Sequence, residues 1–333
     1  MAANRRMLTA AVLVALVPAV AFADDSSAEL GAGGLVLTRS TDIRLADEDL
    51  RISPKDVTAR FTFLNDSRSD IDTLVAFPLP DIDTSRFSEE PLGHTTADPL
   101  NFVGFAVTEN GKKVPFQVEQ RAFYKGKDVT DILRRAGVPL NVVDPRFTKT
   151  LDGIGPQQRA SLEAADLIDR ESGSYTHPHW LVRTKFWWRQ RFPAGKAVTL
   201  DEHYQPVTGE SLIGHEELDA TNENGRYWIK TYCMDAKARG AALALLASNR
   251  ANPQSGNMLT ALATDYVLST GNNWKGPIGR FRLTLDKLKH ENVKSLCAEG
   301  GLEPASPTTF EYVRENFAPK ADIRLLVLQQ APL

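Results

Sequence analysis

The sequence feature that most constrains the fold is an alternation of apolar and polar residues, with a period of two, that runs through residues 34–123. In the segment 57–63 every second residue is apolar: Val57, Ala59, Phe61 and Phe63. Side chains of a β-strand point alternately to opposite faces, so this pattern predicts a strand with one buried face. Farther along, Asn110-Gly111 separates two more alternating runs, and this pair is typical of a hairpin with a type I′ turn. The segment therefore predicts a β-sandwich.

The stretch TLVAFPLPDID, residues 73–83, predicts a strand that runs into two prolines. Pro78 and Pro80 are two residues apart, so their nitrogens point to the same edge of the strand, and neither has an N–H to donate. We expect pairing on that edge to stop at Ala76. Phe77 and Leu79 keep the opposite, core-facing register.

Helical patterns follow in the middle of the chain. Residues 128–137 carry apolar side chains at helical spacing and end at a glycine, and a second helix is predicted from Pro156 through Ile168. The second half opens with two strands joined at residues 193–195. The expected register of that turn places Asp201 and His203 opposite Trp187 and Lys185.

The predicted fold class is mainly β, with two antiparallel β-sandwich-like domains and a helical insertion between them. The predicted boundaries are residues 24–127 for the N-terminal sandwich, 128–179 for the helical insertion or linker, and 180–333 for a C-terminal β-rich domain. One helix, at about residues 234–249, is inserted in the C-terminal domain.

The first 23 residues have the composition of a secretory signal peptide. Two arginines precede an apolar run from Leu8 to Phe22, and Ala21-Phe22-Ala23 forms an Ala-x-Ala cleavage site. The alternative is a membrane anchor, but about 15 apolar residues fall short of the roughly 20 needed to span a bilayer. We therefore expect cleavage after Ala23, a periplasmic or secreted location, and no transmembrane anchor in the mature protein.

The chain has two cysteines, Cys233 and Cys297, both in the exported part. In an oxidising compartment a lone pair most simply forms one disulfide. The alternative is a redox-active or metal-binding pair, which is usually spaced more closely, as in C-x-x-C. The sequence favours the disulfide.

Several stretches together resemble an exported bacterial family of the domain-of-unknown-function 4424 type. They are SSAELGAGGLVL, LRISPKDV, TLVAFPLPDI, WWRQRFPAGKAVTLDEHYQPVTG, YVLSTGNNWKGPIGRFRL and SPTTFEYVRENFAP. The resemblance extends over nearly the whole mature chain and places both cysteines within the family pattern. The N-terminal half is also faintly similar to the β-sandwich domain of vault-associated proteins and inter-alpha-trypsin inhibitor heavy chains. Members of that family often add a metal-binding domain with D-x-S-x-S, which this chain lacks.

The charge balance and the absence of common catalytic motifs limit the classes of function that the sequence favours. The chain has 39 Lys and Arg against 42 Asp and Glu, and this mildly acidic balance argues against nucleic acid as a partner. The sequence contains no G-x-S-x-G, S-x-x-K, H-E-x-x-H or P-loop, so it favours a protein that is not an enzyme and needs no cofactor. We expect a binding or envelope-interaction protein whose partner is a protein or an envelope glycan or lipid.

The candidate binding residues are a row on one face of a predicted strand and a tryptophan in a glycine-rich loop. They are Arg183, Lys185, Trp187, Arg189, Arg191 and Trp274. Cations around an indole can hold an anionic group, with about 1 kcal/mol from a good cation–π contact. The alternative for the row is a solvated face that pairs with Asp201, Glu202 or His203. The alternative for Trp274 is that it closes the end of the sandwich.

A second function hypothesis is a hydrolase or a metal-dependent enzyme. Its site would assemble from His177, His179, His203 and nearby carboxylates. Zinc needs three or four such ligands at about 2 Å, so the hypothesis depends on the fold bringing the three histidines together. The alternative is that His177 and His179 belong to a loop that leads into a strand.

Overall fold

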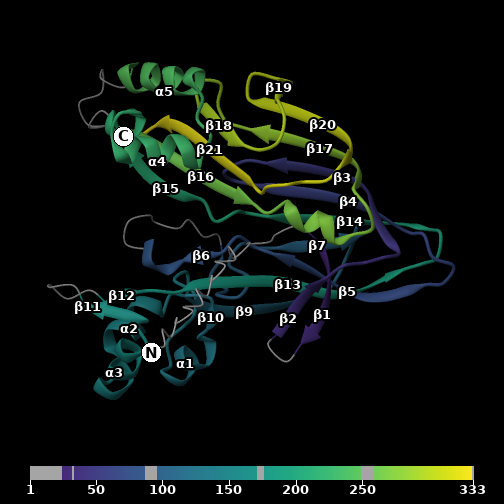
Figure 1. Cartoon of the computed structure of the whole chain (residues 1–333), viewed down its shortest axis with the longest axis horizontal. Coiled ribbons are helices and arrows are strands. Elements are labelled where there is room, and N and C mark those ends of the chain that lie inside the picture. The colour runs from purple at the N-terminus through teal and green to yellow at the C-terminus, as the bar shows by residue number, and fades with distance from the viewer. Residues whose placement is uncertain (1–24, 32–33, 87–95, 171–175, 249–257, 332–333) are drawn as a thin grey trace, which may run out of the picture.

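The computed structural model describes residues 25–31, 34–86, 96–170, 176–248 and 258–331. The predicted signal peptide lies outside these ranges. Two layers of β-sheet face one another, with short helices at the left-hand end of each layer in the view of Figure 1. The mainly β fold class is confirmed. No helix among the described residues is long and apolar enough to cross a membrane.

The first sheet forms the lower layer of Figure 1. Its strand order is β10-β9-β13-β5-β1-β2, with β6 also paired to β13, and all its pairs are antiparallel. The strands are β1 (Ser26–Gly31), β2 (Gly34–Thr38), β5 (Ile71–Pro78), β6 (Ile82–Asp83), β9 (Gln117–Tyr124), β10 (Lys127–Asp128) and β13 (Leu181–Phe192).

The second sheet lies above it, with the order β19-β20-β17-β3-β4-β14-β7-β8. Its pairs are antiparallel except for β3 and β17, which are parallel. The strands are β3 (Ile43–Ile52), β4 (Val57–Asn65), β7 (Ala106–Glu109), β8 (Lys112–Lys113), β14 (Ala197–Tyr204), β17 (Ile278–Asp286), β19 (Glu303–Pro304) and β20 (Thr309–Phe317).

A third sheet extends the upper layer and is covered by two helices. Its order is β15-β16-β21-β18. These elements are β15 (Gly209–Ile213), β16 (Leu259–Tyr266), β18 (Val293–Cys297) and β21 (Ile323–Gln330), with α4 (Glu223–Thr231) and α5 (Ala236–Ser248). Along β21, Leu325 and Val327 join the main core while Leu326 and Leu328 pack under the helices. The sheet is therefore buried on both faces.

The Cys233–Cys297 disulfide is confirmed, with 5.1 Å between its Cα atoms. It joins the link between α4 and α5 to the end of β18. The predicted helix at 234–249 corresponds to α5, which ends at Ser248. The bond therefore fastens the helical cover to the third sheet.

The middle of the chain forms a small helical unit beside the first sheet. Its elements are α1 (Thr130–Arg135), α2 (Phe147–Gly153), α3 (Pro156–Ala164), β11 (Ile168–Arg170) and β12 (Thr176–Pro178). The prediction that the helix from Pro156 continues through Ile168 is wrong at its end. Asp166 has a positive φ of 58°, a conformation that ends a helix, and Ile168 begins a strand instead.

The main core lies between the first and second sheets. Inward side chains on β4 and β13 meet there, with the rings of Phe63 and Phe192 centred 5.6 Å apart. Phe105 stacks on Phe186 at 4.4 Å. Along β4, residues 57, 59, 61, 63 and 65 are buried and those between them are more exposed. The period-two prediction for this strand is confirmed.

Two expectations for the second half need correction. β13 and β14 do not pair, because Trp187 lies opposite Ala76 and Gln117, whereas Asp201 lies opposite Arg60 and Thr108. Both strands present apolar faces to the core from opposite sides, so the turn at 193–195 carries the chain from one sheet to the other. The expected register of Asp201 and His203 against Trp187 and Lys185 is therefore wrong. The predicted division at residue 180 also crosses both main sheets, since β13 and β14 pair with strands before residue 127.

The proline-rich end of β5 behaves as expected. β1 pairs with β5 only through Leu74, Val75 and Ala76, so the ladder on that edge stops where Pro78 lacks its N–H. On the opposite edge the Leu79 N–H donates to the Thr184 carbonyl at 2.9 Å. The chain then returns as β6 to pair with β13 at Leu181 and Val182.

Candidate functional site

A cleft of about 400 Å³ lies between β2 and the outward face of β9 and β13. We call it the hairpin cleft, because the β1–β2 hairpin forms one of its walls. It is lined by apolar side chains and charged side chains together: Leu35, Val36, Leu37, Pro78, Leu79, Asp81, Glu119, Arg121, Phe123, Arg183, Thr184, Lys185 and Asn273. Its volume falls within the range of small-molecule sites, which are commonly about 300–1,000 Å³.

Strand register brings the charged residues of the hairpin cleft together. β9 and β13 are antiparallel neighbours, with Arg183 opposite Arg121 and Lys185 opposite Glu119. Alternate residues of a strand share one face, and opposite residues share it across the pair. Three cations and a carboxylate therefore face the same side of the sheet.

Arg183 is held by contacts on two sides. Its Nε donates to Asp81 Oδ2 at 3.0 Å, and its guanidinium carbon lies 4.3 Å from the centre of the Phe123 ring. Burial raises the pKa of the Asp81 carboxyl, and the Arg183 charge opposes that rise. Within the described residues, no hydrogen bond engages the two terminal amino groups of Arg183. Its side chain is 30% exposed and lines the cleft.

Lys185 fastens the hairpin over the cleft. Its Nζ donates to the Leu35 carbonyl at 2.6 Å and lies 3.6 Å from Glu119 Oε1. The Leu35 N–H donates in turn to Glu119 Oε2 at 2.8 Å. Burial lowers the pKa of the Lys185 ammonium, and Glu119 opposes that change. The Lys185–Glu119 pair thus binds both backbone groups of one β2 residue.

The rest of the predicted row lies outside the cleft. Trp187 packs against the base of the hairpin, beside Leu35 and Ala76. Arg189 is exposed. Arg191 pairs with Asp70 at 2.6 Å, and this contact lowers the pKa of the Asp70 carboxyl.

The basic row on β13 has other partners than the sequence predicted. Asp201, Glu202 and His203 belong to β14 in the second sheet. The row's cations instead pair with Asp81, Glu119 and Asp70.

Trp274 lies in the core and offers no ring face to a ligand. Its side chain is 2% exposed. The indole packs 4.7 Å from the Phe63 ring and 6.0 Å from the Phe192 ring, between centroids. Its Nε1 donates to the Asp25 carbonyl at 2.7 Å. The residue closes the space between the sheets, as its structural alternative expected.

The three histidines of the metal hypothesis do not meet. His177 lies in β12, and His179, just after it, lies 3.4 Å from Asp169. His203 lies on the second sheet and contacts Asp56. Among the described residues, no group of three His, Cys, Asp or Glu side chains is arranged to hold a metal ion. The predicted assembly of His177, His179 and His203 is therefore not formed.

Two other hollows differ from the hairpin cleft. A cavity of about 160 Å³ lies on the other side of Leu79 and Asp81, beside Tyr204 and Tyr232. Its volume is close to that of a cavity that holds one benzene ring. A shallow hollow of about 550 Å³ lies on the second sheet, over Arg60, Asp201 and Arg282.

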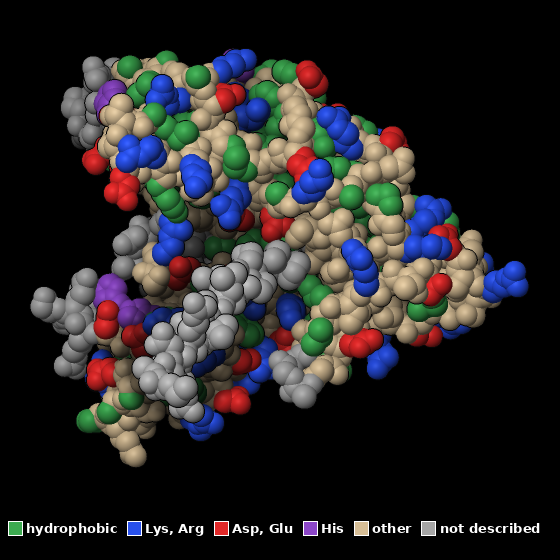
Figure 2. Space-filling view, viewed as in Figure 1, with side chains coloured by type: hydrophobic (Ala, Val, Ile, Leu, Met, Phe, Trp, Pro, Cys, Tyr) green, Lys and Arg blue, Asp and Glu red, His purple; other side chains and the backbone are tan. Residues whose placement is uncertain are grey.

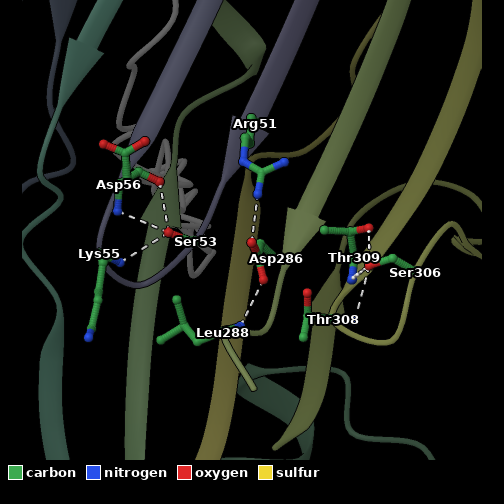
Figure 3. Close-up of polar contacts among 9 residues, drawn as sticks. All are labelled: Arg51, Ser53, Lys55, Asp56, Asp286, Leu288, Ser306, Thr308 and Thr309. Carbon is green, nitrogen blue, oxygen red and sulfur yellow. Dashed lines mark hydrogen bonds and ion pairs between the residues drawn. The ribbon is translucent and has the colours of Figure 1, made fainter. Parts of the chain in front are cut away.

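Polar groups around the second-sheet hollow bind one another. Arg60 pairs with Asp201, and Arg282 pairs with Glu311 at 2.7 Å. At one end of the sheet Arg51 pairs with Asp286 at 2.6 Å, while the Ser53 hydroxyl accepts N–H groups within its own turn (Figure 3). Figure 2 shows basic and acidic side chains interspersed over much of the visible face. These groups form a solvated outer face.

Sequence reasoning missed part of the hairpin cleft. Glu119, Arg121 and Phe123 have the spacing of one strand face in the run QVEQRAFY, so their shared orientation was readable. Their position beside Arg183 depends on the pairing of β9 with β13, which joins residues about 60 apart and has no local signal. Asp81 sits in the proline-rich exit segment that the sequence did single out.

Distant likenesses to solved structures include the following two proteins. A Legionella pneumophila protein described as a "putative nutrient binding protein" has 16% identity and a TM-score of 0.44, over 92% of this chain and 70% of that one. Native yeast LTA4 hydrolase has 9% identity and a TM-score of 0.26, over 86% of this chain and 29% of that one. Neither likeness is close enough to carry an argument about fold or function.

The family is shown by sequence. No curated protein matches the chain. Residues 23–326 match the family described as a domain of unknown function, DUF4424. The match extends over most of the chain, and the resemblance noted from its motifs is confirmed. The similarity to the vault and inter-alpha-trypsin inhibitor sandwich stays a prediction. The chain belongs to the DUF4424 family.

Proposed function

We propose that this protein is an exported, non-catalytic binding protein, periplasmic or secreted, whose hairpin cleft holds a small amphipathic anion. The ligand class is a carboxylate or phosphate attached to an apolar body. Export is supported by the signal-like residues 1–23 and by the disulfide, a bond that persists in oxidising compartments. The family match also begins at residue 23, beside the expected cleavage site.

The observation that carries the ligand class is the state of Arg183. Asp81 holds its Nε, Phe123 supports its planar face, and its two terminal amino groups have no partner among the described residues. A guanidinium fixed in this way loses little side-chain entropy when it binds, and its fork matches a carboxylate or phosphate. A hydrogen bond to a charged group contributes about 1.5–3 kcal/mol.

The surroundings of Arg183 favour the same ligand. Arg121, Arg183 and Lys185 line the cleft together with two carboxylates, Asp81 and Glu119. Arg121 also pairs with Asp128, so among the described residues Arg183 is the cation whose terminal donors are not engaged. Leu35, Leu37 and Phe123 supply apolar walls. An anion with an apolar body would bind the terminal amino groups of Arg183 and cover these walls.

A binding assay with alkyl carboxylates and alkyl phosphates of graded length tests the proposal. We expect saturable binding by calorimetry, with affinity that rises with chain length. Arg183→Lys should weaken binding about ten-fold or more, since an ammonium cannot form the bidentate contact and 1.4 kcal/mol corresponds to ten-fold. Arg189→Lys, outside the cleft, is the matched control and should leave binding unchanged. Equal affinities for both variants, or no binding of any of these anions, would contradict the proposal.

Export has a separate test. N-terminal sequencing of the protein recovered from the periplasm or medium of a bacterial host should begin at Asp24. Recovery of the intact N-terminus in the cytoplasm would overturn this part of the proposal.

A further inference from the structure

Three carboxyl side chains are buried between the two main sheets. Asp25 and Glu48 are fully buried, and Glu202 is 3% exposed. We call these residues the carboxyl cluster. Acidic side chains are almost never buried to this extent without a positive partner, because the charged form loses its hydration. A member of the cluster that no other group satisfies therefore needs a proton or a cation.

The register of the second sheet places two of the three acids. Glu48 of β3 lies opposite Phe61 of β4, and Glu202 of β14 lies opposite Ala59 of the same strand. Both acids point into the core from the two neighbours of β4, on a diagonal across the small Ala59 side chain. Asp25 is close enough to both for Glu202 to influence the pKa of the Asp25 carboxyl and for the Asp25 charge to raise the pKa of Glu48.

Glu48 is the member whose need for a cation is clearest. Neither of its carboxyl oxygens has a hydrogen-bond partner among the described residues. The charges that act on it, Asp25 and Asp47, are both negative. Burial raises the pKa of Asp25 to about 8 and raises the pKa of Glu48 well above its usual value. Without a cation, Asp25 and Glu48 therefore hold their protons to a higher pH than exposed carboxyls do.

The end of the β1–β5 ladder explains why Asp25 enters the core. Ser26 lies opposite Ala76, so the next pairs in this register would set residue 25 against Phe77 and residue 24 against Pro78. Pro78 has no N–H to donate, and pairing stops at Ser26. The Trp274 indole holds the Asp25 carbonyl at 2.7 Å, and Asn273 Nδ2 donates to the Ser26 hydroxyl at 2.9 Å. The chain at Asp25 is thus fixed between the layers.

We propose that the carboxyl cluster is the binding site for the α-ammonium group that removal of residues 1–23 creates on Asp24. This inference rests on the cleavage site within the proposed function. Hydrolysis of the Ala23–Asp24 peptide bond consumes one water. The new carboxylate leaves on Ala23, and the amine stays on Asp24 and takes up a proton.

Covalent geometry brings the ammonium within reach. Consecutive Cα atoms are about 3.8 Å apart and an N–Cα bond is about 1.5 Å, so the new nitrogen lies within about 5 Å of the Asp25 Cα. In the uncleaved chain the same nitrogen is an uncharged amide. Cleavage therefore adds one positive charge beside three buried acids, and the processed and unprocessed forms differ in the electrostatics of their core.

The charge has a defined effect on its neighbours. An ammonium ion beside the cluster favours ionisation of one carboxyl and is itself favoured by the carboxylate, so the pKa of the amine rises. Among the residues that the structure describes, the groups that face it are Asp25, Glu48, Glu202 and, more distantly, Asp47 and the buried Tyr204 phenol, whose pKa is raised by burial and by Glu202. All of them are acids, so none repels the ammonium.

Two proteins with defined N-termini test the site. One begins at Asp24 and contains every residue that the structure describes, and the other carries a Gly-Ser-Gly extension before Asp24. The rate of α-amine acylation at pH 8 is measured by peptide mass spectrometry, folded and in denaturant. In the Asp24 protein, folding should slow acylation about ten-fold or more, the factor that corresponds to one pKa unit. The extended protein should react at nearly the same rate in both states.

Substitution of Glu48 separates the ammonium site from simple burial of the terminus. Glu48→Gln in the Asp24 protein should bring the folded acylation rate back toward the denatured rate. Glu315→Gln, an exposed carboxyl on β20, is the control and should not. Acylation at the denatured rate in the folded Asp24 protein, or slow acylation unaffected by Glu48→Gln, would overturn the inference. Because both N-termini are set by design, the result does not depend on where cells cleave the chain or on the ligand of the hairpin cleft.

Discussion

The hairpin cleft and the carboxyl cluster both gather charged side chains, but they treat charge differently. In the cleft each acid has a cation beside it, as in the pairs Arg183–Asp81 and Lys185–Glu119. In the cluster, Glu48 is fully buried and its two oxygens have no partner among the described residues. A paired, partly exposed site can accept a ligand at little cost. A buried group of acids needs a permanent counter-charge, and this difference leads us to assign a ligand to one site and the chain terminus to the other.

The largest expected effect is a difference in stability between two tryptophan variants, one at Trp274 beside the carboxyl cluster and one at Trp187 under the hairpin. Trp274→Ala should destabilise the protein by about 3–5 kcal/mol, because it empties a fully packed site and leaves the Asp25 carbonyl without its donor. Trp187→Ala, under the hairpin and only partly buried, should cost clearly less. Urea unfolding measures both. Equal losses would mean that the hairpin side of the first sheet is packed as firmly as the core.

The pH dependence of stability should come from the carboxyl cluster. Burial raises the pKa values of Asp25 and Glu48 in the folded state, that of Asp25 to about 8 from a usual value of 3.8. The folded state then binds more protons than the unfolded state between these limits. The buried acids therefore contribute most to the free energy of unfolding below about pH 4. Their contribution falls as the pH rises toward 8.

The matched measurement compares thermal midpoints of the two N-terminal forms from pH 5 to 8. The Gly-Ser-Gly protein should lose stability over this range, and the Asp24 protein should lose less. Identical pH profiles would contradict an ammonium ion at the cluster.

A smaller effect is expected at the lid of the hairpin cleft. Lys185→Met removes the donor to the Leu35 carbonyl and leaves Glu119 without its ammonium partner, which should cost about 1–3 kcal/mol for the partly buried groups left unpaired. The Leu35 amide should then exchange its hydrogen faster, while core amides such as that of Phe63 keep their protection. Lys196→Met, at the exposed turn after β13, is the control. Unchanged exchange at Leu35 would show that Lys185 does not hold the hairpin.

The smallest effect is predicted at the far end of the same strand. Arg191 and Asp70 are paired at 2.6 Å but exposed to solvent, and such pairs contribute little because water and salt screen them. Arg191→Gln should leave both the thermal midpoint and anion binding unchanged. A loss of binding would move the ligand site from the hairpin cleft toward the exposed end of β13.

Local patterns predicted the local structure well. The alternation in β4, the stop at Pro78 and the helix after Cys233 were all readable, because each depends on residues close together in the chain. The disulfide was predictable because the chain has only two cysteines and we expected it to reach an oxidising compartment. The partner of β13 was not readable, since its apolar face suits either a hairpin with β14 or a place in the opposite sheet. The pairing error carried over to Asp201 and His203.

The candidate site was predictable only in part. The basic row contained Arg183 and Lys185, but their partners Asp81 and Glu119 come from two other segments joined by sheet pairing. Trp274 was marked for its glycine-rich loop, which does not distinguish a ligand contact from a core position. Glu48 and Glu202 gave no signal, because an acid at an inward position of an alternating strand resembles a break in the pattern until its neighbours are known.

The most direct test of the proposed function observes Arg183 itself. Side-chain nitrogen NMR of the arginine guanidinium groups can be followed while an alkyl phosphate is titrated into the protein. The Arg183 signals should shift and saturate with the binding curve, while those of Arg189 and Arg191 stay in place. Saturable binding with no change at Arg183, or equal changes at all three arginines, would contradict a ligand site in the hairpin cleft.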